Sequence, residues 1–404
     1  MKVLFLALGD YTSVKNRGIY LDLLREFISE GHEVYIVTTL KPETGERFRL
    51  IEEEGSHLLK VQAGRITKTN AIEKGINMLL IEKRYIRAIE KHFPGVRFDL
   101  VLYPTPPITF LKVVDYIRRR DGAKSYLMLK DIFPQNAVDI GMMSKSGLKG
   151  ILYRRFRNKE RKLYRISDHI GCMSRANVEY LLRHNPELDP AKVEICPNST
   201  DVSDTSVGGE ARLAIREKYG IPADKKVFVY GGNLGKPQGI PFLVECLKAA
   251  KDIEGACFLV IGNGTEYKKL ESYASTSGQE NFILMKRIPR DDYEAMVGAC
   301  DVGMIFLDHR FTIPNFPSRL LSYMQAKLPV LACTDPNTDI GKVITEGGFG
   351  WWCESNDAAA FAGKVREIMD TDPEPMKETE FRFLQEHYTS REAYRIIMHS
   401  ISQE

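Results

Sequence analysis

The chain has 404 residues, of which 43% are hydrophobic and 27% are charged, and its formal net charge is +3. A prior of roughly 100–200 residues per domain predicts two domains, each large enough to bury a full core. This composition is typical of a soluble globular protein, and a transmembrane helix is excluded because no run of about 18 apolar residues occurs. So small a net charge excludes no class of partner, so the distribution of charges matters more than their sum.

The cysteines and the first residues bear on the cellular compartment. The cysteines form no C-x-x-C pair and most lie in apolar runs, which predicts buried, reduced thiols in a cytoplasmic protein. Residues 1–8 are apolar but lead into Gly9 and Asp10 with no small-residue cleavage site, so they are interpreted as a first strand and not as a signal peptide. The seven cysteines are Cys172, Cys196, Cys246, Cys257, Cys300, Cys333 and Cys353.

Predicted strands and helices alternate from the start of the chain. Residues 3–8 and 34–38 are apolar strands on either side of a helix over residues 19–29, which together make a βαβ unit. A strand over residues 99–103 leads into the proline-rich loop 104–107. Further strands before residue 200 are predicted at residues 125–129, 169–173 and 193–195.

A polar, glycine-rich stretch at residues 200–212 predicts a linker, after which the alternation restarts. The later strands are predicted at residues 227–230, 257–261, 282–285, 302–306 and 330–333. The pattern predicts an α/β protein with two Rossmann-like parallel-sheet domains, residues 1–203 and 204–385, and an amphipathic helix within residues 386–404 that crosses back to the first domain. Because open α/β sheets bind ligands at the carboxyl ends of their strands, we expect the domains to face each other across a cleft lined by strand-end loops.

Three strand-end segments of the second domain could contact a ligand. In residues 231–239, small residues would let a phosphate approach the backbone, and Lys236 would add a positive charge. Residues 262–265 again place glycines before a helix, and residues 286–289 close the next strand, where the backbone could contact a nucleobase. Simple turns are the alternative for each segment. The fingerprint G-x-G-x-x-G is absent in register, so a Rossmann dehydrogenase is poorly supported.

Residues 311–334 predict a loop, a short helix and a buried strand. Pro314 and Pro317 keep the loop out of helix, Ser318 is predicted to be the N-cap, and Arg319 projects from the first turn. Backbone N–H groups and a guanidinium would then point at the loop, an arrangement that suits an anionic diphosphate. An ordinary strand–helix–strand unit with a surface arginine is the alternative.

In the first domain, Asp131 directly follows a buried strand. An acid at such a position, facing a cleft, can position or deprotonate a substrate hydroxyl. It could equally cap the following turn or pair with Lys130. Asn198 follows the last strand of this domain, where either turn geometry or a ligand contact would explain it.

Residues 145–165 contain nine Lys or Arg and one Glu. Apolar residues recur on one face of the predicted helix, namely Leu148, Ile151, Leu152, Phe156 and Leu163. This pattern favours a helix that lies on an anionic membrane surface, and a core-packed helix with a charged outer face is the alternative. No nucleic-acid partner is expected because no recognised nucleic-acid module accompanies the basic run. No metal site is expected either, because the histidines show no clustered ligand spacing.

A series of motifs follows in order along the chain: GHEV (31–34), KDIFP (130–134), CPNSTD (196–201), YGGNLGKPQG (230–239), IGNG (261–264), PSRLLSYM (317–324) and PV (329–330). Their order and spacing resemble the retaining GT-B glycosyltransferases of glycosyltransferase family four. Within that family they are similar to the subgroup that builds bacterial surface polysaccharides, including O-antigen and capsule. The resemblance covers essentially the whole chain.

The resemblance implies transfer of a hexosyl or N-acetylhexosaminyl group from a nucleotide sugar, with UDP as the expected nucleotide and no cofactor or metal. It implies that the second domain holds the donor and the first holds a polyprenyl-linked or saccharide acceptor. Lys236 and Arg319 match the family's two basic donor-site residues, and Asp131 is the third catalytic candidate. The remaining donor-site candidates are Gly232, Asn233, Gly235, Gln238, Gly262, Asn263, Gly264, Arg287, Ile288, Asn315, Pro317, Ser318 and Ser322, and the acceptor-side candidates are Arg17, Gly18 and Asn198.

The sequence departs from the family's pattern at four donor-site positions and in the typical N-terminal glycine-rich loop, of which only residues 16–18 remain. Asn233 and Gln238 stand where an Arg and a Lys are usual, and Pro314 and Ser322 stand where a pair of glutamates is usual. Two other functions therefore stay open. A nucleotide-sugar epimerase of the same fold would need several poised acids and bases, which the sequence does not locate, and a non-catalytic glycosyltransferase-like subunit is favoured by the missing glutamates.

Overall fold

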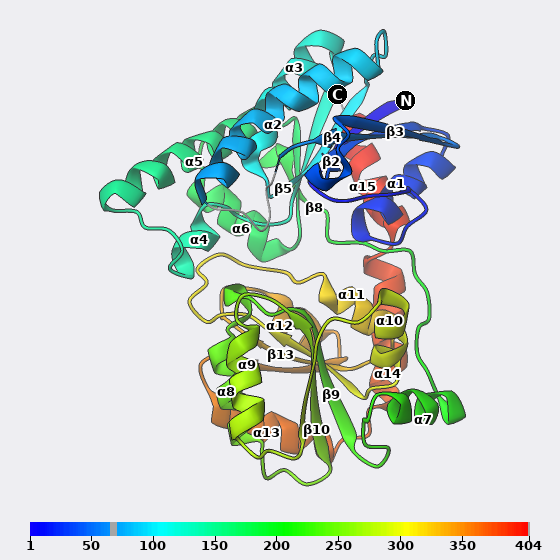
Figure 1. The fold of residues 1–404 in the computed structure, drawn as a ribbon, viewed down its shortest axis with the longest axis vertical. Helices are drawn as coiled ribbons and strands as arrows, with labels where there is room; N and C mark the ends of the chain where they lie inside the picture. Colours follow the sequence, from blue (N-terminus) through cyan, green and yellow to red (C-terminus); the bar gives the residue numbers. More distant parts are fainter. Residues whose placement is uncertain (65–70, 403–404) are drawn as a thin grey trace. The chain divides into compact units, whose positions relative to one another are not determined.

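The structure is a computed structural model that describes residues 1–64 and 71–402. The chain divides into two compact units, the first made of Met1–Asp201 with Thr389–Glu404 and the second of Val202–Tyr388. Each unit consists of one largely parallel β-sheet with helices on both faces (Figure 1). The predicted fold class, two Rossmann-like parallel-sheet domains, is confirmed.

The sheet of the first unit has eight strands in the order β3-β4-β2-β1-β5-β6-β7-β8. All neighbouring strands are parallel except β3, which pairs antiparallel with β4. The strands are β1 (Lys2–Leu6), β2 (Glu33–Leu40), β3 (Phe48–Glu53), β4 (Ser56–Gln62), β5 (Leu100–Thr105), β6 (Lys124–Leu129), β7 (His169–Cys172) and β8 (Val193–Ile195).

Helices α1 and α15 lie on one face of this sheet, and α2, α3 and α5 lie on the other (Figure 1). The C-terminal helix completes a core, because its residues Ala393, Ile397 and Ile401 are buried against β1 and α1. The helices are α1 (Ile19–Ser29), α2 (Ala71–His92), α3 (Leu111–Asp121), α4 (Gln135–Asp139), α5 (Gly147–Ile166), α6 (Arg175–His184) and α15 (Ser390–Ser402), with short 3₁₀ turns η1 (Pro42–Thr44), η2 (Ile108–Phe110) and η3 (Pro190–Lys192).

The sheet of the second unit is wholly parallel, with six strands in the order β11-β10-β9-β12-β13-β14. Helices α8, α9 and α13 cover one face, and α10, α11 and α14 cover the other (Figure 1). Its elements are α7 (Gly209–Lys218), β9 (Lys226–Asn233), η4 (Lys236–Gln238), α8 (Ile240–Ala249), β10 (Ala256–Asn263), α9 (Tyr267–Thr276), β11 (Phe282–Met285), α10 (Arg290–Gly298), β12 (Val302–Phe306), α11 (Arg319–Gln325), β13 (Val330–Thr334), α12 (Ile340–Glu346), β14 (Gly350–Glu354), α13 (Ala358–Met369) and α14 (Glu374–His387).

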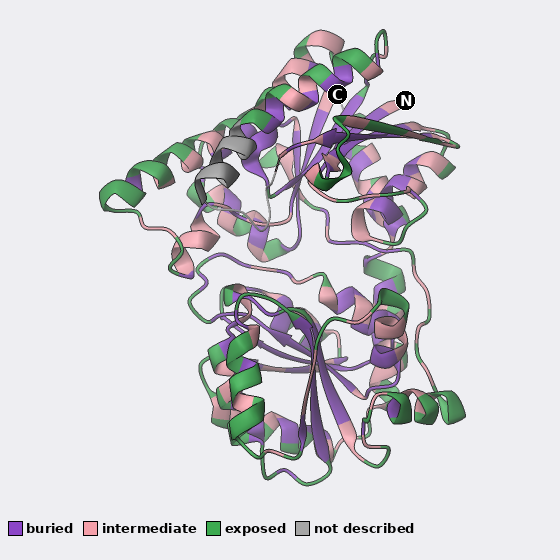
Figure 2. Cartoon of the chain, in the orientation of Figure 1, coloured by how far each residue is buried: buried purple, intermediate pink, exposed green. Residues whose placement is uncertain are grey.

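The central strands of both sheets are buried on both faces, so their sequences are continuous apolar runs instead of alternating patterns. All six residues of β5 are buried, as are all five of β12 (Figure 2). All seven cysteines are buried and free, as the sequence predicted. The hairpin of β3 and β4 was not predicted, because the charged residues of β3 hide the strand pattern at the sheet's exposed edge.

The second half of the basic helix α5 follows the alternative prediction, a helix packed on the core with a charged outer face. Leu163 is fully buried in the unit, and Phe156 packs against Phe133 with 5.3 Å between ring centroids. Only Leu148, Ile151 and Leu152 remain exposed. The periodicity was read correctly, but the C-terminal half of that face is covered by the protein's own core.

Candidate functional site

The carboxyl edge of the second sheet brings together three of the predicted donor segments. Strands β9 and β10 stay paired in register up to Gly262 opposite Gly232 and Asn263 opposite Asn233. These four residues therefore belong to the strands, whereas the sequence predicted that the strands end at residues 230 and 261. From β9 the chain winds to β10 and β11 on one side and returns to β12 on the other, so β9 and β12 flank the topological switch point where open α/β sheets bind ligands.

Protein atoms fill the space beside each glycine of this edge. A side chain at Gly231 would collide with the ring of Tyr293, and one at Gly232 would collide with the guanidinium of Arg319. Gly232 also has a φ of 128°, which disfavours any L side chain. A side chain at Gly262 or Gly264 would meet the backbone of the neighbouring β9 segment. Close packing within the protein therefore requires these glycines before any ligand is considered.

Arg319, at the start of α11, is the best-placed cation of this edge. Its guanidinium carbon lies 4.3 Å from the ring centroid of Tyr230, a cation–π contact. Burial by itself would lower the pKa of Arg319, but the phenol groups of Tyr230, Tyr323 and Tyr293 favour the charged form, and the pKa is raised on balance. Within the described residues no carboxylate lies at ion-pair distance from this half-buried guanidinium. It is therefore a fixed positive charge available to an anion.

Ser318 stands at the N-cap position of α11, as predicted, but it does not cap the helix with its side chain. Ser318 already has helical backbone angles, φ −62° and ψ −11°, and its side chain makes no capping hydrogen bond. The first turn is instead closed by the N–H of Leu320, which donates to the carbonyl of Pro317 at 3.2 Å, and by the N–H of Leu321, which donates to that of Ser318 at 3.1 Å. Because α11 has only seven residues, its helix dipole is small. The guanidinium of Arg319 therefore supplies more of the positive potential here than the end of the helix does.

The turn after β9 holds the two residues that replace the usual basic pair. The Gln238 Oε1 accepts hydrogen bonds from the Asn233 Nδ2 at 3.0 Å and from the Gly235 N–H at 3.2 Å. Two amide side chains thus close the turn upon itself. Lys236, at its tip, is exposed and makes no ion pair among the described residues. Its ammonium is accessible to an anion, but no contact links it to Arg319.

The remaining donor candidates lie around this edge. Arg287 and Ile288 follow β11, the outermost strand, two strands away from β9. The carbonyl of Asn315 accepts a hydrogen bond from the Thr338 hydroxyl, which ties the loop before α11 to the segment after β13. Pro317 precedes α11 and Ser322 lies within it, each partly exposed.

Asp335, directly after β13, is a buried acid that the sequence reasoning missed. Its Oδ1 accepts hydrogen bonds from the N–H groups of Asn337 at 2.9 Å and Thr338 at 3.2 Å. Its Oδ2 is buried with no hydrogen-bond partner in the described part of the chain. Burial raises the pKa of Asp335 to about 6. The signal that singled out Asp131, an acid immediately after a buried strand, would also have found it.

In the first unit, Asp131 lies beyond β6 and is half-buried. Asn136 of α4 donates a hydrogen bond to the Asp131 Oδ2 at 2.6 Å, and the Oδ1 has no partner among the described residues. Burial raises the pKa of Asp131 to about 6. The suggested pairing with Lys130 is wrong, because the Lys130 ammonium donates at 3.2 Å to the carbonyls of Cys196 and Pro197 instead.

The acceptor-side candidates divide between a surface loop and a buried position. Asn198 is buried, and its side-chain amide lies 3.5 Å from the sulfur of Met173. Arg17 is exposed, and the N–H of Gly18 at the start of α1 donates to the Asp22 carboxylate at 2.8 Å.

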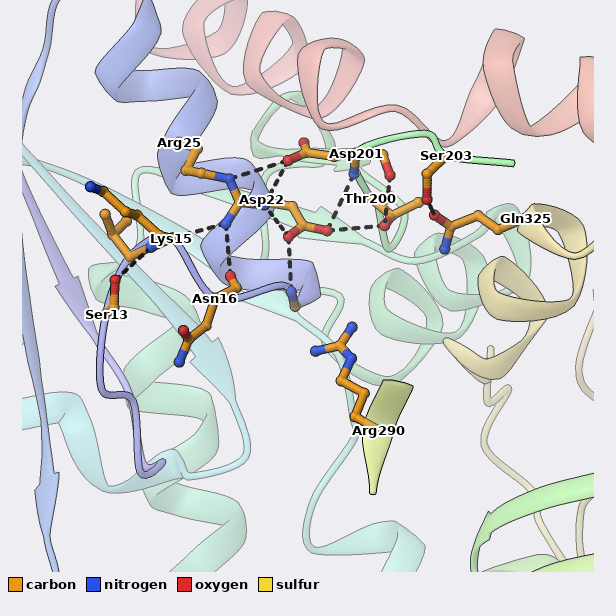
Figure 3. A network of polar contacts seen from close by, with 12 residues as sticks. Ser13, Lys15, Asn16, Asp22, Arg25, Thr200, Asp201, Ser203, Arg290 and Gln325 are labelled. Carbon is orange, nitrogen blue, oxygen red and sulfur yellow. Dashed lines mark hydrogen bonds and ion pairs between the residues drawn. The ribbon is translucent and has the colours of Figure 1, made fainter. Parts of the chain in front are cut away.

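A charged network fixes this surface loop (Figure 3). The Arg25 guanidinium donates to the carbonyls of Val14 at 2.8 Å and Asn16 at 2.7 Å. It also forms ion pairs with Asp22 and with Asp201 at 2.5 and 2.6 Å. One arginine therefore holds both the start of α1 and Asp201, where the first segment of the first unit ends.

The described residues contain no group of three or more His, Cys, Asp or Glu side chains placed to hold a metal ion. None of their helices is both long and apolar enough to span a bilayer.

Two family models match the chain. The model described as "Glycosyltransferase Family 4" matches residues 19–204, and the one described as "Glycosyl transferases group 1" matches residues 211–381. Among curated proteins, the probable glycosyltransferase WbjE of Pseudomonas aeruginosa is 26% identical over 80% of this chain and 79% of its own. The putative colanic acid biosynthesis glycosyl transferase WcaI of Escherichia coli is 20% identical over 91% of this chain and 92% of its own.

Solved structures share the fold over the full length. Sucrose-phosphate synthase from Thermosynechococcus elongatus superposes with a TM-score of 0.77 at 15% identity, covering 100% of this chain and 98% of that one. HepE from Anabaena, solved in complex with UDP, superposes with a TM-score of 0.68 at 14% identity and covers 100% of both chains. At these identities the likeness concerns the fold alone.

Proposed function

Because the chain is a glycosyltransferase with the GT-B fold, we propose that it moves a sugar from a UDP-linked donor to a polyprenyl-linked or saccharide acceptor in the synthesis of a surface polysaccharide. The name of WcaI, which refers to colanic acid biosynthesis, supports the polysaccharide context, and the UDP complex of HepE supports the nucleotide. The resemblance to family four supports retention of the anomeric configuration and a hexosyl or N-acetylhexosaminyl donor.

The observation that carries this proposal is the environment of Arg319. A half-buried guanidinium without a carboxylate partner, at the switch point of a Rossmann-like sheet, suits a diphosphate better than it suits an internal ion pair. In the proposed reaction the bond between the sugar and the diphosphate breaks and the leaving UDP gains negative charge. Arg319 would stabilise that charge, with Lys236 as the second cation and without a metal ion.

Asp131 is proposed to assist the acceptor hydroxyl. One of its oxygens is held by Asn136, and the other is left without a partner among the described residues, so it can accept the hydroxyl proton. A pKa of about 6 leaves the carboxylate ionised at neutral pH yet more basic than an ordinary aspartate.

Calorimetric titration of UDP in the presence of a chelator tests the donor site. Arg319→Ala should weaken UDP binding by on the order of tenfold to a hundredfold, the scale of one charge-assisted hydrogen-bonding group, and Arg319→Lys should recover only part because the planar fork is lost. Arg382→Ala is the matched control, since Arg382 is an exposed arginine of the same unit on α14. Unchanged affinity in Arg319→Ala, or a strict need for a divalent metal, would show that the phosphate site is assigned wrongly.

The replaced glutamate pair favours one competing function, a subunit that binds the nucleotide sugar without transferring the sugar. Pro314 has no ionisable group, and Ser322 is partly exposed on α11. Incubating the protein with a panel of UDP-sugars and membrane extract separates the possibilities. Sugar transfer supports the proposal, binding without turnover indicates the subunit, and conversion of the donor without any acceptor indicates an epimerase.

A further inference from the structure

The first half of α5 and the turn before it expose apolar side chains that the first unit does not cover. Leu148 is 87% exposed, Ile151 58% and Leu152 46%, and Met142 in the preceding turn is 61% exposed. These residues make up four of the nine large hydrophobic side chains that the described structure leaves exposed. Figure 2 shows the beginning of α5 as exposed, in contrast to the strands of the sheet.

The two halves of α5 also differ in whether their basic residues form ion pairs. In the second half, Arg157 pairs with Glu160 at 2.6 Å, Lys159 with Glu82 at 3.0 Å and Arg161 with Glu187 at 3.4 Å. In the first half, the exposed residues Lys149, Arg154 and Arg155 have no carboxylate at ion-pair distance in the described ranges. Residues 141–159 contain no Asp or Glu at all. Every basic residue of the packed half except the exposed Lys162 is therefore paired with an acid, whereas the positive charge is uncompensated where the apolar residues are exposed.

The second half of α5 holds the helix in place. Leu163 and Tyr164 are buried, and the Tyr164 hydroxyl donates to the buried carboxylate of Glu160 at 2.7 Å. The exposed half consequently extends from a fixed base and needs no folding transition to meet a partner.

We propose that this surface, here called the α5 patch, binds the anionic face of a lipid bilayer. The patch consists of Met142, Lys145, Leu148, Lys149, Ile151, Leu152, Arg154 and Arg155. Aliphatic side chains that enter the headgroup region and cations that contact lipid phosphates are the two components of interfacial helix binding. A second copy of the chain is a poor partner, because a two-fold contact would bring the uncompensated charges of both patches together. The proposal is independent of the donor site.

Co-sedimentation of the full chain with vesicles tests the α5 patch. We expect binding to phosphatidylcholine vesicles that contain phosphatidylglycerol, little binding to phosphatidylcholine alone, and a loss of binding as salt is raised. Each basic residue near an anionic surface contributes roughly a fivefold factor. The double variant R154Q/R155Q should therefore lower the partition coefficient by on the order of twentyfold, and L148S/I151S should weaken binding at every salt concentration.

Matched controls exclude general effects of charge and stability. The double variant K251Q/K268Q removes the same charge from exposed lysines of the second unit and should bind vesicles like the wild type. Thermal unfolding and UDP affinity should be unchanged in all patch variants, so a failure of this proposal is distinguishable from a failure of the proposed function. Equal binding to neutral and anionic vesicles, no binding to either, or equal loss in the control would overturn the proposal. So would light scattering that shows a dimer which L148S/I151S dissociates.

Discussion

The guanidinium of Arg319 occupies the space that a side chain at Gly232 would need. Gly232 and Arg319 therefore pack directly against each other although they are 87 residues apart in the sequence. The missing side chain of Gly232 leaves the space in which the guanidinium is held. Tyr230, Tyr293 and Tyr323 complete the surroundings of the arginine. The Tyr323 hydroxyl lies 3.1 Å from the carbonyls of both Val229 and Met304, which ties α11 to strands β9 and β12.

Gly232→Ala should disturb the packing between Gly232 and Arg319. The new methyl group must displace the Arg319 guanidinium, and alanine is strained at a φ of 128°. We expect a loss of about 1–3 kcal/mol of unfolding free energy together with weaker UDP binding. Gly363→Ala is the control, because Gly363 lies exposed within α13 with nothing near its missing side chain, and there alanine should stabilise by about 0.5–1 kcal/mol. Full UDP affinity in Gly232→Ala would contradict the coupling.

Asp131→Asn should lower turnover while leaving UDP affinity nearly unchanged. The wild-type kcat/KM should rise as the pH increases through about 6, because the carboxylate must be ionised to accept a proton. The asparagine variant should lose this limb of the pH profile. Wild-type turnover would contradict the catalytic role, and a lower thermal stability with a normal pH profile would indicate that the Asp131–Asn136 contact is structural.

At the scale of elements, the C-terminal helix α15 belongs to the first unit although the second unit precedes it in the sequence. Tyr394 packs edge-on against Phe27 of α1, with 4.8 Å between ring centroids, and its hydroxyl lies 2.9 Å from the His32 Nε2. The Ser400 hydroxyl donates to Glu194 of β8 at 2.6 Å. The first unit is therefore complete only when the end of the chain has been made.

Ile397→Ala tests this dependence. Ile397 is fully buried in the core of the first unit, so its truncation should cost about 2–5 kcal/mol of unfolding free energy, measured by urea denaturation. Arg395→Ala on the same helix removes an exposed side chain with one surface ion pair and should change stability by less than about 0.5 kcal/mol. Equal effects of the two substitutions would mean that α15 does not complete the core.

The elements also show what a sequence can predict. Apolar runs identified the buried parallel strands, because a strand buried on both faces is apolar at every position. The predicted helix at residues 19–29 matches α1, because a helix buried along one stripe has apolar residues at helical spacing. The charged edge strand β3 and the split burial of α5 depend on which surfaces the rest of the chain covers. In the same way, a strand end located Asp131 and a predicted helix start located Arg319, whereas their contacts with Asn136 and Gly232 arise from tertiary packing.

At the scale of the whole molecule, each unit carries a strand-end acid whose pKa is raised to about 6, Asp131 in the first and Asp335 in the second. For an acid with a raised folded-state pKa, the native state binds the proton more tightly than the unfolded state does. Its contribution to stability is therefore largest at low pH and is lost as the pH rises from about 4 to about 6. Other carboxylates act in the opposite direction, so the effect has to be isolated by comparing variants with the wild type.

Asp335→Asn should isolate the pH-dependent contribution of the Asp335 carboxyl to stability. Asparagine resembles the neutral acid and keeps an oxygen that can accept from Asn337 and Thr338, so the variant and the wild type should differ little at pH 4. By pH 7 the variant should gain up to about 3 kcal/mol relative to the wild type, which must hold a buried charge. Asp308→Asn is the control: burial by itself would raise the pKa of Asp308, but the Arg310 guanidinium lowers it on balance, so its effect should stay constant from pH 4 to 7. Urea unfolding across this pH range measures both differences, and a constant difference for Asp335→Asn would contradict the raised pKa.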